Sequence, residues 1–176
     1  MSNLIFPEKT SLQEGHIVSL IPVDLAKEDS ALLELLRQQG EHEAVIAQRA
    51  DSTWYRAGFG PTPNQGGIWV SGTTLVPLGG QTPSGTVNSI LCTYDRYNWL
   101  GWQNQISLRL YITNANQTLA WTAPLDITSG STTVSAAGVS IPANCRITLQ
   151  IKVGNITGGL YQPPYISSYD CTVSYS

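Results

Sequence analysis

Two stretches of the chain alternate apolar and polar residues one by one. They are QISLRLYIT at residues 105–113 and CRITLQIKV at residues 145–153. Because successive side chains of a strand point to opposite faces, each stretch predicts a strand that is buried on one face and wet on the other. The residues expected on the buried faces are Ile106, Leu108, Leu110 and Ile112 in the first stretch, and Ile147, Leu149, Ile151 and Val153 in the second.

Weaker runs of β-branched and aromatic residues, separated by Gly, Pro, Asn and Ser, predict further strands. These runs are GIWVSG (67–72), TLVPL (74–78), TVNSILCTY (86–94), TLAWT (118–122), TTVSA (132–136) and YDCTVSYS (169–176). Together with the two alternating stretches they predict a mainly β protein, an antiparallel β-sandwich or jelly roll of about eight strands. Other Greek-key sandwiches stay open as alternatives.

The first part of the chain has a different composition. Of the 21 charged residues, fourteen precede residue 57. The segment DLAKEDSALLELLRQQG predicts a helix, since Asp24 can cap its start and Gly40 suits the position after its end. A short further helix is expected in EHEAVIAQRA, and HIVSLIPV is expected to be a strand or an extended arm. We therefore expect an N-terminal arm and helical segment over 1–56 and a jelly-roll-like sandwich over 57–176.

Charge and hydropathy argue against two classes of partner, nucleic acids and the membrane interior. Charged residues form only 12% of the chain, and the net charge is −3 with no cluster of Lys or Arg. A nucleic-acid ligand is not expected, because binding to phosphates needs a basic surface. The start of the chain has no apolar signal region, and no apolar run approaches the thickness of a bilayer, so we expect no transmembrane segment.

Catalytic motifs are missing from the sequence. His16 and His42 are the two histidines, and no spacing of His, Cys or carboxylates matches a metal site, a nucleophile elbow or a phosphate-binding loop. We expect no enzyme activity, no metal and no cofactor. The three cysteines lack a CxxC spacing and each lies in a strand-like run, which indicates buried free thiols, with one bridge as the alternative: Cys92, Cys145 and Cys171.

The stretch YDRYNWLGWQNQ at residues 94–105 places four large aromatic side chains among polar ones. They could stack on a sugar, anchor a protein interface, or plug the open end of a sandwich. A second aromatic stretch, YQPPYISSY at residues 161–169, poses the same choice, and two such loops favour several contact surfaces over one pocket. The candidate interface or ligand-contact residues are Tyr94, Asp95, Arg96, Tyr97, Trp99, Trp102, Tyr161 and Tyr165.

An acid-bearing N-terminal segment, a single eight-strand pattern over residues 58–176, weak surface charge and aromatic loops together resemble a viral coat subunit. The chain is similar to the small single-jelly-roll capsid proteins of tailless icosahedral bacteriophages with an internal membrane. This resemblance implies a shell protein located in the virion, which pairs with copies of itself and with a second, larger coat protein. It also implies that the N-terminal arm could clamp or exchange with a neighbouring subunit.

Two other functions stay open. Leu25, Leu32 and Ile46 fall on one heptad position, which would suit a short coiled coil leading into a trimeric phage fibre head or receptor-binding domain. Alternatively, the chain could be a monomeric carbohydrate-binding module that uses Trp99 and Trp102 to bind a glycan, for example one on a host surface.

Overall fold

The protein is mainly β, with two five-stranded sheets and one small two-stranded sheet. A computed structural model describes residues 17–23 and 52–176, and these residues contain no helix. The first sheet has the order β1-β9-β6-β12-β3, the second the order β2-β8-β7-β10-β5, and β11 pairs with β4. The strand bounds are β1 Ile17–Ser19, β2 Ile21–Val23, β3 Ser52–Phe59, β4 Gln65–Gly66, β5 Val70–Leu75, β6 Val87–Tyr94, β7 Ile106–Asn114, β8 Ala120–Leu125, β9 Ser131–Ser135, β10 Cys145–Val153, β11 Gly158–Gly159 and β12 Ser168–Tyr175.

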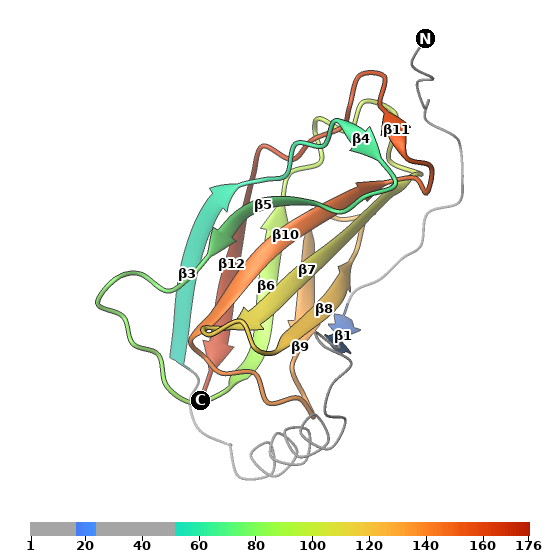
Figure 1. The fold of residues 1–176 in the computed structure, drawn as a ribbon. Coiled ribbons are helices and arrows are strands. Elements are labelled where there is room, and N and C mark those ends of the chain that lie inside the picture. The colour runs from blue at the N-terminus through green and yellow to red at the C-terminus, as the bar shows by residue number, and fades with distance from the viewer. Residues whose placement is uncertain (1–16, 24–51) are drawn as a thin grey trace.

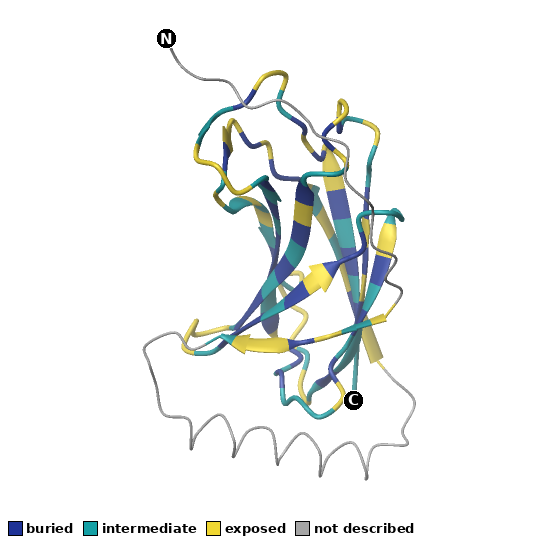
Figure 2. Cartoon of the chain, turned by 90° about the vertical axis from the view of Figure 1, so that its right-hand side faces the viewer, coloured by how far each residue is buried: buried dark blue, intermediate teal, exposed yellow. Residues whose placement is uncertain are grey.

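The two large sheets form two layers, with the second sheet in front of the first in Figure 1. Their inward side chains form one apolar core, and burial alternates along the strands (Figure 2). The hydroxyl of Tyr169 on β12 donates a hydrogen bond to the carbonyl oxygen of Thr73 on β5. Trp54 on β3 reaches the other end of the core, where its indole N–H donates to the carbonyl oxygen of Ala143 at 2.9 Å. Both of these polar groups are therefore hydrogen-bonded to backbone carbonyl groups, as buried polar groups usually are.

The alternating stretches are strands with the predicted orientation. β10 covers residues 145–153 as expected, and β7 begins and ends one residue later than predicted. All eight apolar positions predicted for the buried faces of these two strands are buried. The two strands pair over their whole length, from Cys145 opposite Asn114 to Val153 opposite Ile106. The period-2 pattern thus predicted both the strands and their inward faces.

Strand β3 was not predicted from the sequence. It covers STWYRAGF, so the expected boundary between residues 56 and 57 falls inside a strand that pairs with β12 over eight residues. The helical segments predicted in 24–40 and 41–50 lie outside the described residues. The sequence predicts about eight strands, whereas the two large sheets contain ten. Eight of these come from residues 52–176 and two from residues 17–23.

The short segment Ile17–Val23 joins both sheets at the same side of the layers. β1 runs parallel to β9 in the first sheet, and β2 runs antiparallel to β8 in the second. Leu20, between the two strands, is buried in the shared core. Pro22 lies within β2, where a missing N–H is tolerated because β2 is an edge strand. Residues 17–23 of the predicted arm therefore pair with the strands β9 and β8 of their own chain.

Candidate interaction surfaces

The two aromatic stretches lie together at one end of the layers, drawn at the top in Figure 1. The backbone N–H of Tyr165 donates to the carbonyl oxygen of Asn98 at 3.1 Å, and the amide group of Asn98 donates to the hydroxyl of Ser167 at 3.1 Å. The backbone N–H of Ser168 donates to the Asp95 carboxylate at 3.0 Å. We call this region, residues 94–105 and 160–168, the aromatic end. The loops form one end of the molecule and not two separate contact surfaces.

Most of the predicted contact residues of the first stretch are buried at this end. Trp102 has no exposed surface, and its indole N–H donates to the carbonyl oxygen of Gln162 at 2.9 Å. Trp99 is 3% exposed, and the Arg96 guanidinium lies over its ring at 5.2 Å from the centroid. Tyr94 is also buried, and its hydroxyl lies 2.8 Å from that of Thr132. The expectation that Trp99 and Trp102 stack on a sugar or on a partner is wrong for this conformation, because both rings plug the end of the core.

Three predicted candidates remain accessible at the aromatic end. Tyr97 is 92% exposed, while Tyr161 and Tyr165 are 44% and 37% exposed. Asp95 and Arg96 are partly buried. Of the predicted candidates, these three tyrosines therefore offer the large exposed side chains at this end, next to Leu100, which is 52% exposed.

The three cysteines are buried free thiols, as predicted. Cys92 on β6 lies opposite Cys171 on β12. A hydrogen bond with Cys92 and burial raise the pKa of the Cys171 thiol, and burial raises that of Cys145 to about 12. The thiols of Cys145 and Cys171 therefore stay protonated at neutral pH, and a protonated thiol is a poor nucleophile and a poor metal ligand.

The outer face of the first sheet is almost uncharged. Fourteen of its outward side chains form three rows across the strands, since the register places them side by side, and Phe59 and Ser168 form a further pair at one end of the sheet. The rows are Ser19, Ser135, Ser89, Ser174 and Thr53; Ile17, Thr133, Leu91, Thr172 and Tyr55; and Ser131, Thr93, Asp170 and Ala57. We call these fourteen residues the Ser/Thr face.

The Ser/Thr face carries an apolar row at its middle. Ile17 is 73% exposed, Leu91 43% and Tyr55 53%. Asp170 is the only charged residue of this face. Desolvation and, after it, the nearby Asp170 carboxylate raise the pKa of Tyr55 further above neutral pH, so this side chain adds no charge. A wet sheet face usually carries charges that oppose pairing with other molecules. This face has almost none, which favours contact with another protein surface.

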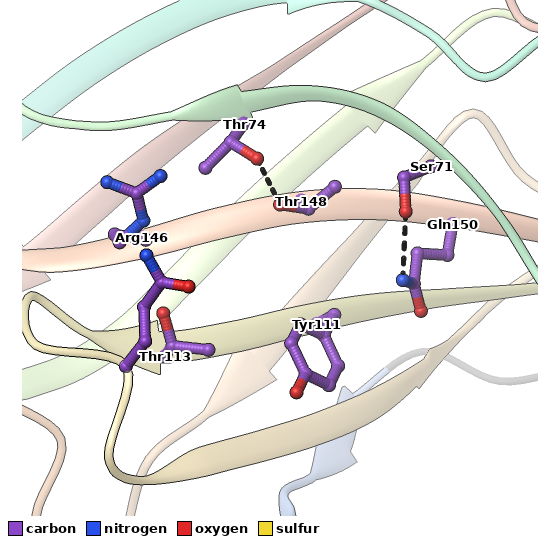
Figure 3. A pocket seen from close by; sticks show the side chains of 8 residues that line it. Ser71, Thr74, Tyr111, Thr113, Arg146, Thr148 and Gln150 are labelled. Atoms are coloured by element: carbon purple, nitrogen blue, oxygen red, sulfur yellow. Dashed lines mark hydrogen bonds between the residues drawn. The ribbon is translucent and has the colours of Figure 1, made fainter.

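The outer face of the second sheet, unlike the Ser/Thr face, carries several cationic side chains from β7 and β10. It contains a shallow groove of about 220 Å³ (Figure 3). The groove is lined by Ser71, Thr74, Tyr111, Thr113, Gln117, Arg146, Thr148 and Gln150. These residues come from β5, β7 and β10 and from the turn after β7, so the site exists only once the sheet has formed.

Hydrogen bonds hold the polar side chains of the groove. The hydroxyls of Thr74 and Thr148 lie 2.8 Å apart, and the Gln150 amide donates to the hydroxyl of Ser71 at 3.0 Å (Figure 3). On its other side, the Gln150 side-chain oxygen accepts a hydrogen bond from Arg109 at 2.7 Å. The Arg109 guanidinium in turn stacks on Trp69, at 4.1 Å from the ring centroid.

Neither face of the described sheets contains a cluster of side chains that could hold a metal ion. Within residues 17–23 and 52–176, no group of three or more His, Cys, Asp or Glu side chains could hold a metal ion. His16 and His42 lie outside these ranges. No helix in the described part of the chain is long and apolar enough to span a membrane.

Comparisons with known proteins give one informative likeness. No family model matches the chain, and no curated protein matches it. A solved structure, the crystal structure of FLHE, is similar with a TM-score of 0.53 and 21% sequence identity, over 72% of this chain and 98% of that chain. At this level of identity the likeness concerns the fold alone, and it extends over the larger part of the β-structure described here.

Proposed function

We propose that the protein is a structural subunit that assembles through protein–protein contacts, with the Ser/Thr face as its main contact surface. The observation that carries this proposal is the composition of that face, which has one charge in fourteen outward positions and a middle row in which three of the five side chains are apolar and exposed. Copies can approach through such a face without desolvating many charges.

The strand order supports a jelly-roll assignment within this proposal. The eight strands that residues 52–176 contribute to the two large sheets can be lettered B to I along the chain. In the first sheet, the order β9-β6-β12-β3 becomes G-D-I-B. In the second sheet, the order β8-β7-β10-β5 becomes F-E-H-C. This alternation between the sheets is that of a double Greek key, an architecture common in viral capsid and lectin domains.

The size of the Ser/Thr face sets the expected strength of a single contact. Five strands spaced about 4.8 Å apart and three rows along them give roughly 500 Å² of projected area. Standard interfaces bury about 800 Å² per partner, so one contact of this kind should be weak. A closed shell holds weak contacts together because each subunit makes several of them.

The same proposal places the subunit in a virion and gives it a second coat protein as partner. This part of the proposal rests on the resemblance of the sequence to small single-jelly-roll capsid proteins. Mass spectrometry of purified virus particles from the source of this chain would test that placement. The trimeric fibre head depends on the heptad pattern of residues 25–46, which lies outside the described residues, so it stays a prediction from sequence.

The assembly proposal is tested by sedimentation velocity over a concentration series, with Leu91→Glu as the key variant. Leu91 lies on the central strand β6 and in the middle row, so copies that meet through this face would bring two introduced carboxylates close together. We expect concentration-dependent self-association of the parent protein and at least a tenfold weakening in Leu91→Glu. Leu78→Glu is the matched control, because Leu78 is 51% exposed but lies outside the sheets.

Two results of the sedimentation series would contradict the proposal. A parent protein that stays monomeric at millimolar concentration would overturn the proposal. Equal weakening by Leu91→Glu and Leu78→Glu would show that added charge, and not the Ser/Thr face, controls association.

A further inference from the structure

We propose that the groove on the outer face of the second sheet binds one carboxylate-bearing sugar unit of an acidic polysaccharide. This site lies on the opposite side of the molecule from the Ser/Thr face, and it is independent of the proposed assembly. It also differs from the sugar site expected from the sequence, which relied on the buried Trp99 and Trp102.

The charge of this sheet face indicates an acidic ligand. Arg109, Arg146 and Lys152 all point outward from β7 and β10, because they alternate with buried residues. The three carboxylates of residues 52–176 lie elsewhere: Asp95 at the aromatic end, Asp126 buried and Asp170 on the Ser/Thr face. The groove therefore has a positive potential that no neighbouring acid on the described strands cancels.

Arg146 is the cation that a ligand carboxylate would meet. It lines the groove directly, and within the described part of the chain no hydrogen bond or ion pair involves it. Arg109 is less available, since it already donates to Gln150 and stacks on Trp69. An arginine with a free guanidinium can bind a carboxylate through two parallel hydrogen bonds.

The other lining groups suit a sugar ring. Tyr111 lies opposite Thr148 in the β7–β10 pair and offers an aromatic ring in the groove. The hydroxyls of Ser71, Thr74 and Thr148 and the Gln150 amide can exchange hydrogen bonds with sugar hydroxyls, and their mutual hydrogen bonds hold them in place beforehand. Figure 3 shows these side chains around one hollow on neighbouring strands.

The volume limits the ligand to one unit of a chain. The groove measures about 220 Å³, which is below the roughly 300 to 1,000 Å³ of pockets that enclose a whole small ligand. It is also open to solvent along the sheet. A polymer could therefore place one ring in the groove and continue across the strands on either side.

Isothermal titration calorimetry with acidic oligosaccharides tests this inference. The probes are oligogalacturonate, oligoalginate, hyaluronan oligomers and oligosialic acid. Each has its methyl-esterified form as the matched neutral control, which keeps the sugar units and removes the charges. We expect at least one acidic oligomer to bind, its ester to bind at least tenfold more weakly, and sodium sulfate to compete only weakly.

Variants then assign the binding to the groove. Arg146→Gln and Tyr111→Ala should each weaken binding at least tenfold. Lys152→Gln is the control, since it removes a charge from the same sheet face but does not line the groove, and it should weaken binding less than threefold. Far-ultraviolet circular dichroism checks that each variant is folded.

Four results would overturn the proposal. They are no binding of any acidic oligomer at millimolar concentration, equal binding of the esters, full competition by sulfate, and equal effects of Arg146→Gln and Lys152→Gln. Equal binding of the esters would identify a neutral-sugar site, and full competition by sulfate a general anion site.

Discussion

Cys92 and Cys171 lie directly opposite each other on the neighbouring strands β6 and β12, and both side chains are fully buried in the core. Cys145, from the second sheet, is close enough for its thiol pKa to be raised by Cys171 in addition to the larger effect of burial. The three thiols therefore belong to one part of the core to which both sheets contribute. The protonation of Cys145 and Cys171 is linked to folding, because the pKa of each thiol is raised in the folded protein, that of Cys145 chiefly by burial and that of Cys171 by its hydrogen bond with Cys92 and by burial.

The raised pKa of Cys145 predicts a loss of stability at alkaline pH. Its thiol has a pKa of about 12 in the folded protein and about 9 in the unfolded chain. Between these values the unfolded chain releases a proton that the folded protein retains, so rising pH favours unfolding. The stabilisation is complete below pH 9 and is lost as pH approaches 12, at roughly 1.4 kcal/mol per pH unit for one thiol.

Urea unfolding at pH 8 and pH 10 measures this effect. Buried tyrosines titrate in the same direction, so the comparison is between the parent protein and Cys145→Ala, which lacks only this thiol. We expect the free energy of unfolding to fall less between the two pH values in the variant. An equal fall in both proteins would show that Cys145 does not contribute.

Trp102 is predicted to be a stability residue and not a contact residue. It is completely buried and hydrogen-bonded to the carbonyl oxygen of Gln162, so Trp102→Ala should cost about 3 to 5 kcal/mol of unfolding free energy. Tyr97→Ala, in the same loop but 92% exposed, should change it by less than about 0.5 kcal/mol. Urea denaturation followed by circular dichroism measures both. Similar costs for the two variants would contradict the plug described here.

The burial of the aromatic side chains in residues 94–105 could not be predicted from the sequence. Residues 94–105 are rich in Asn, Gln and Gly, which is typical of an exposed loop, so the sequence leaves open whether their aromatic side chains contact a sugar, anchor a partner or plug the end of the sandwich. What buries them is the second loop at residues 160–168, which covers the same end of the core and supplies the carbonyl groups that accept the Trp102 hydrogen bond. Sequence periodicity cannot show that two distant loops meet.

Local patterns predicted the parts of the fold that depend on local information. Ile106 to Ile112 and Ile147 to Val153 alternate strictly, and both strands have the predicted inward faces. The Ser/Thr face and the groove depend instead on strand register. Ile17, Leu91 and Tyr55 share a row, and Ser71, Tyr111 and Arg146 share a groove, although long stretches of sequence separate them. Their polar neighbours were interpreted only as the wet side of strands.

Leu20 should be the residue through which the Ile17–Val23 segment contributes to stability. It is buried in the core between two short edge strands, so Leu20→Ala should lower the free energy of unfolding by about 2 to 3 kcal/mol. Ile21→Ala is the matched control, because Ile21 follows Leu20 directly in the chain and its side chain is 56% exposed. Denaturation curves of both variants measure the difference. If the segment left its own chain to pair with a neighbour, the effect of Leu20→Ala would depend on protein concentration.

Gly60 marks a point where two backbone segments approach too closely for any side chain. It follows β3, and its N–H donates to the carbonyl oxygen of Ser167 at 3.1 Å. A Cβ atom built on Gly60 would lie 2.1 Å from the carbonyl oxygen of Ile166, which is backbone and cannot rotate away. Gly60→Ala must therefore separate β3 from the segment that leads into β12.

We expect Gly60→Ala to destabilise the protein by more than about 2 kcal/mol, in the range of overpacked cores and strained backbones. Gly79→Ala is the control, since a Cβ atom there meets nothing within 4 Å. That change should leave stability unaltered or raise it by about 0.5 kcal/mol, because alanine restricts the unfolded chain more than glycine does. Thermal and urea denaturation of both variants test this contrast, and a Gly60→Ala variant as stable as Gly79→Ala would show that the two segments lie farther apart than described here.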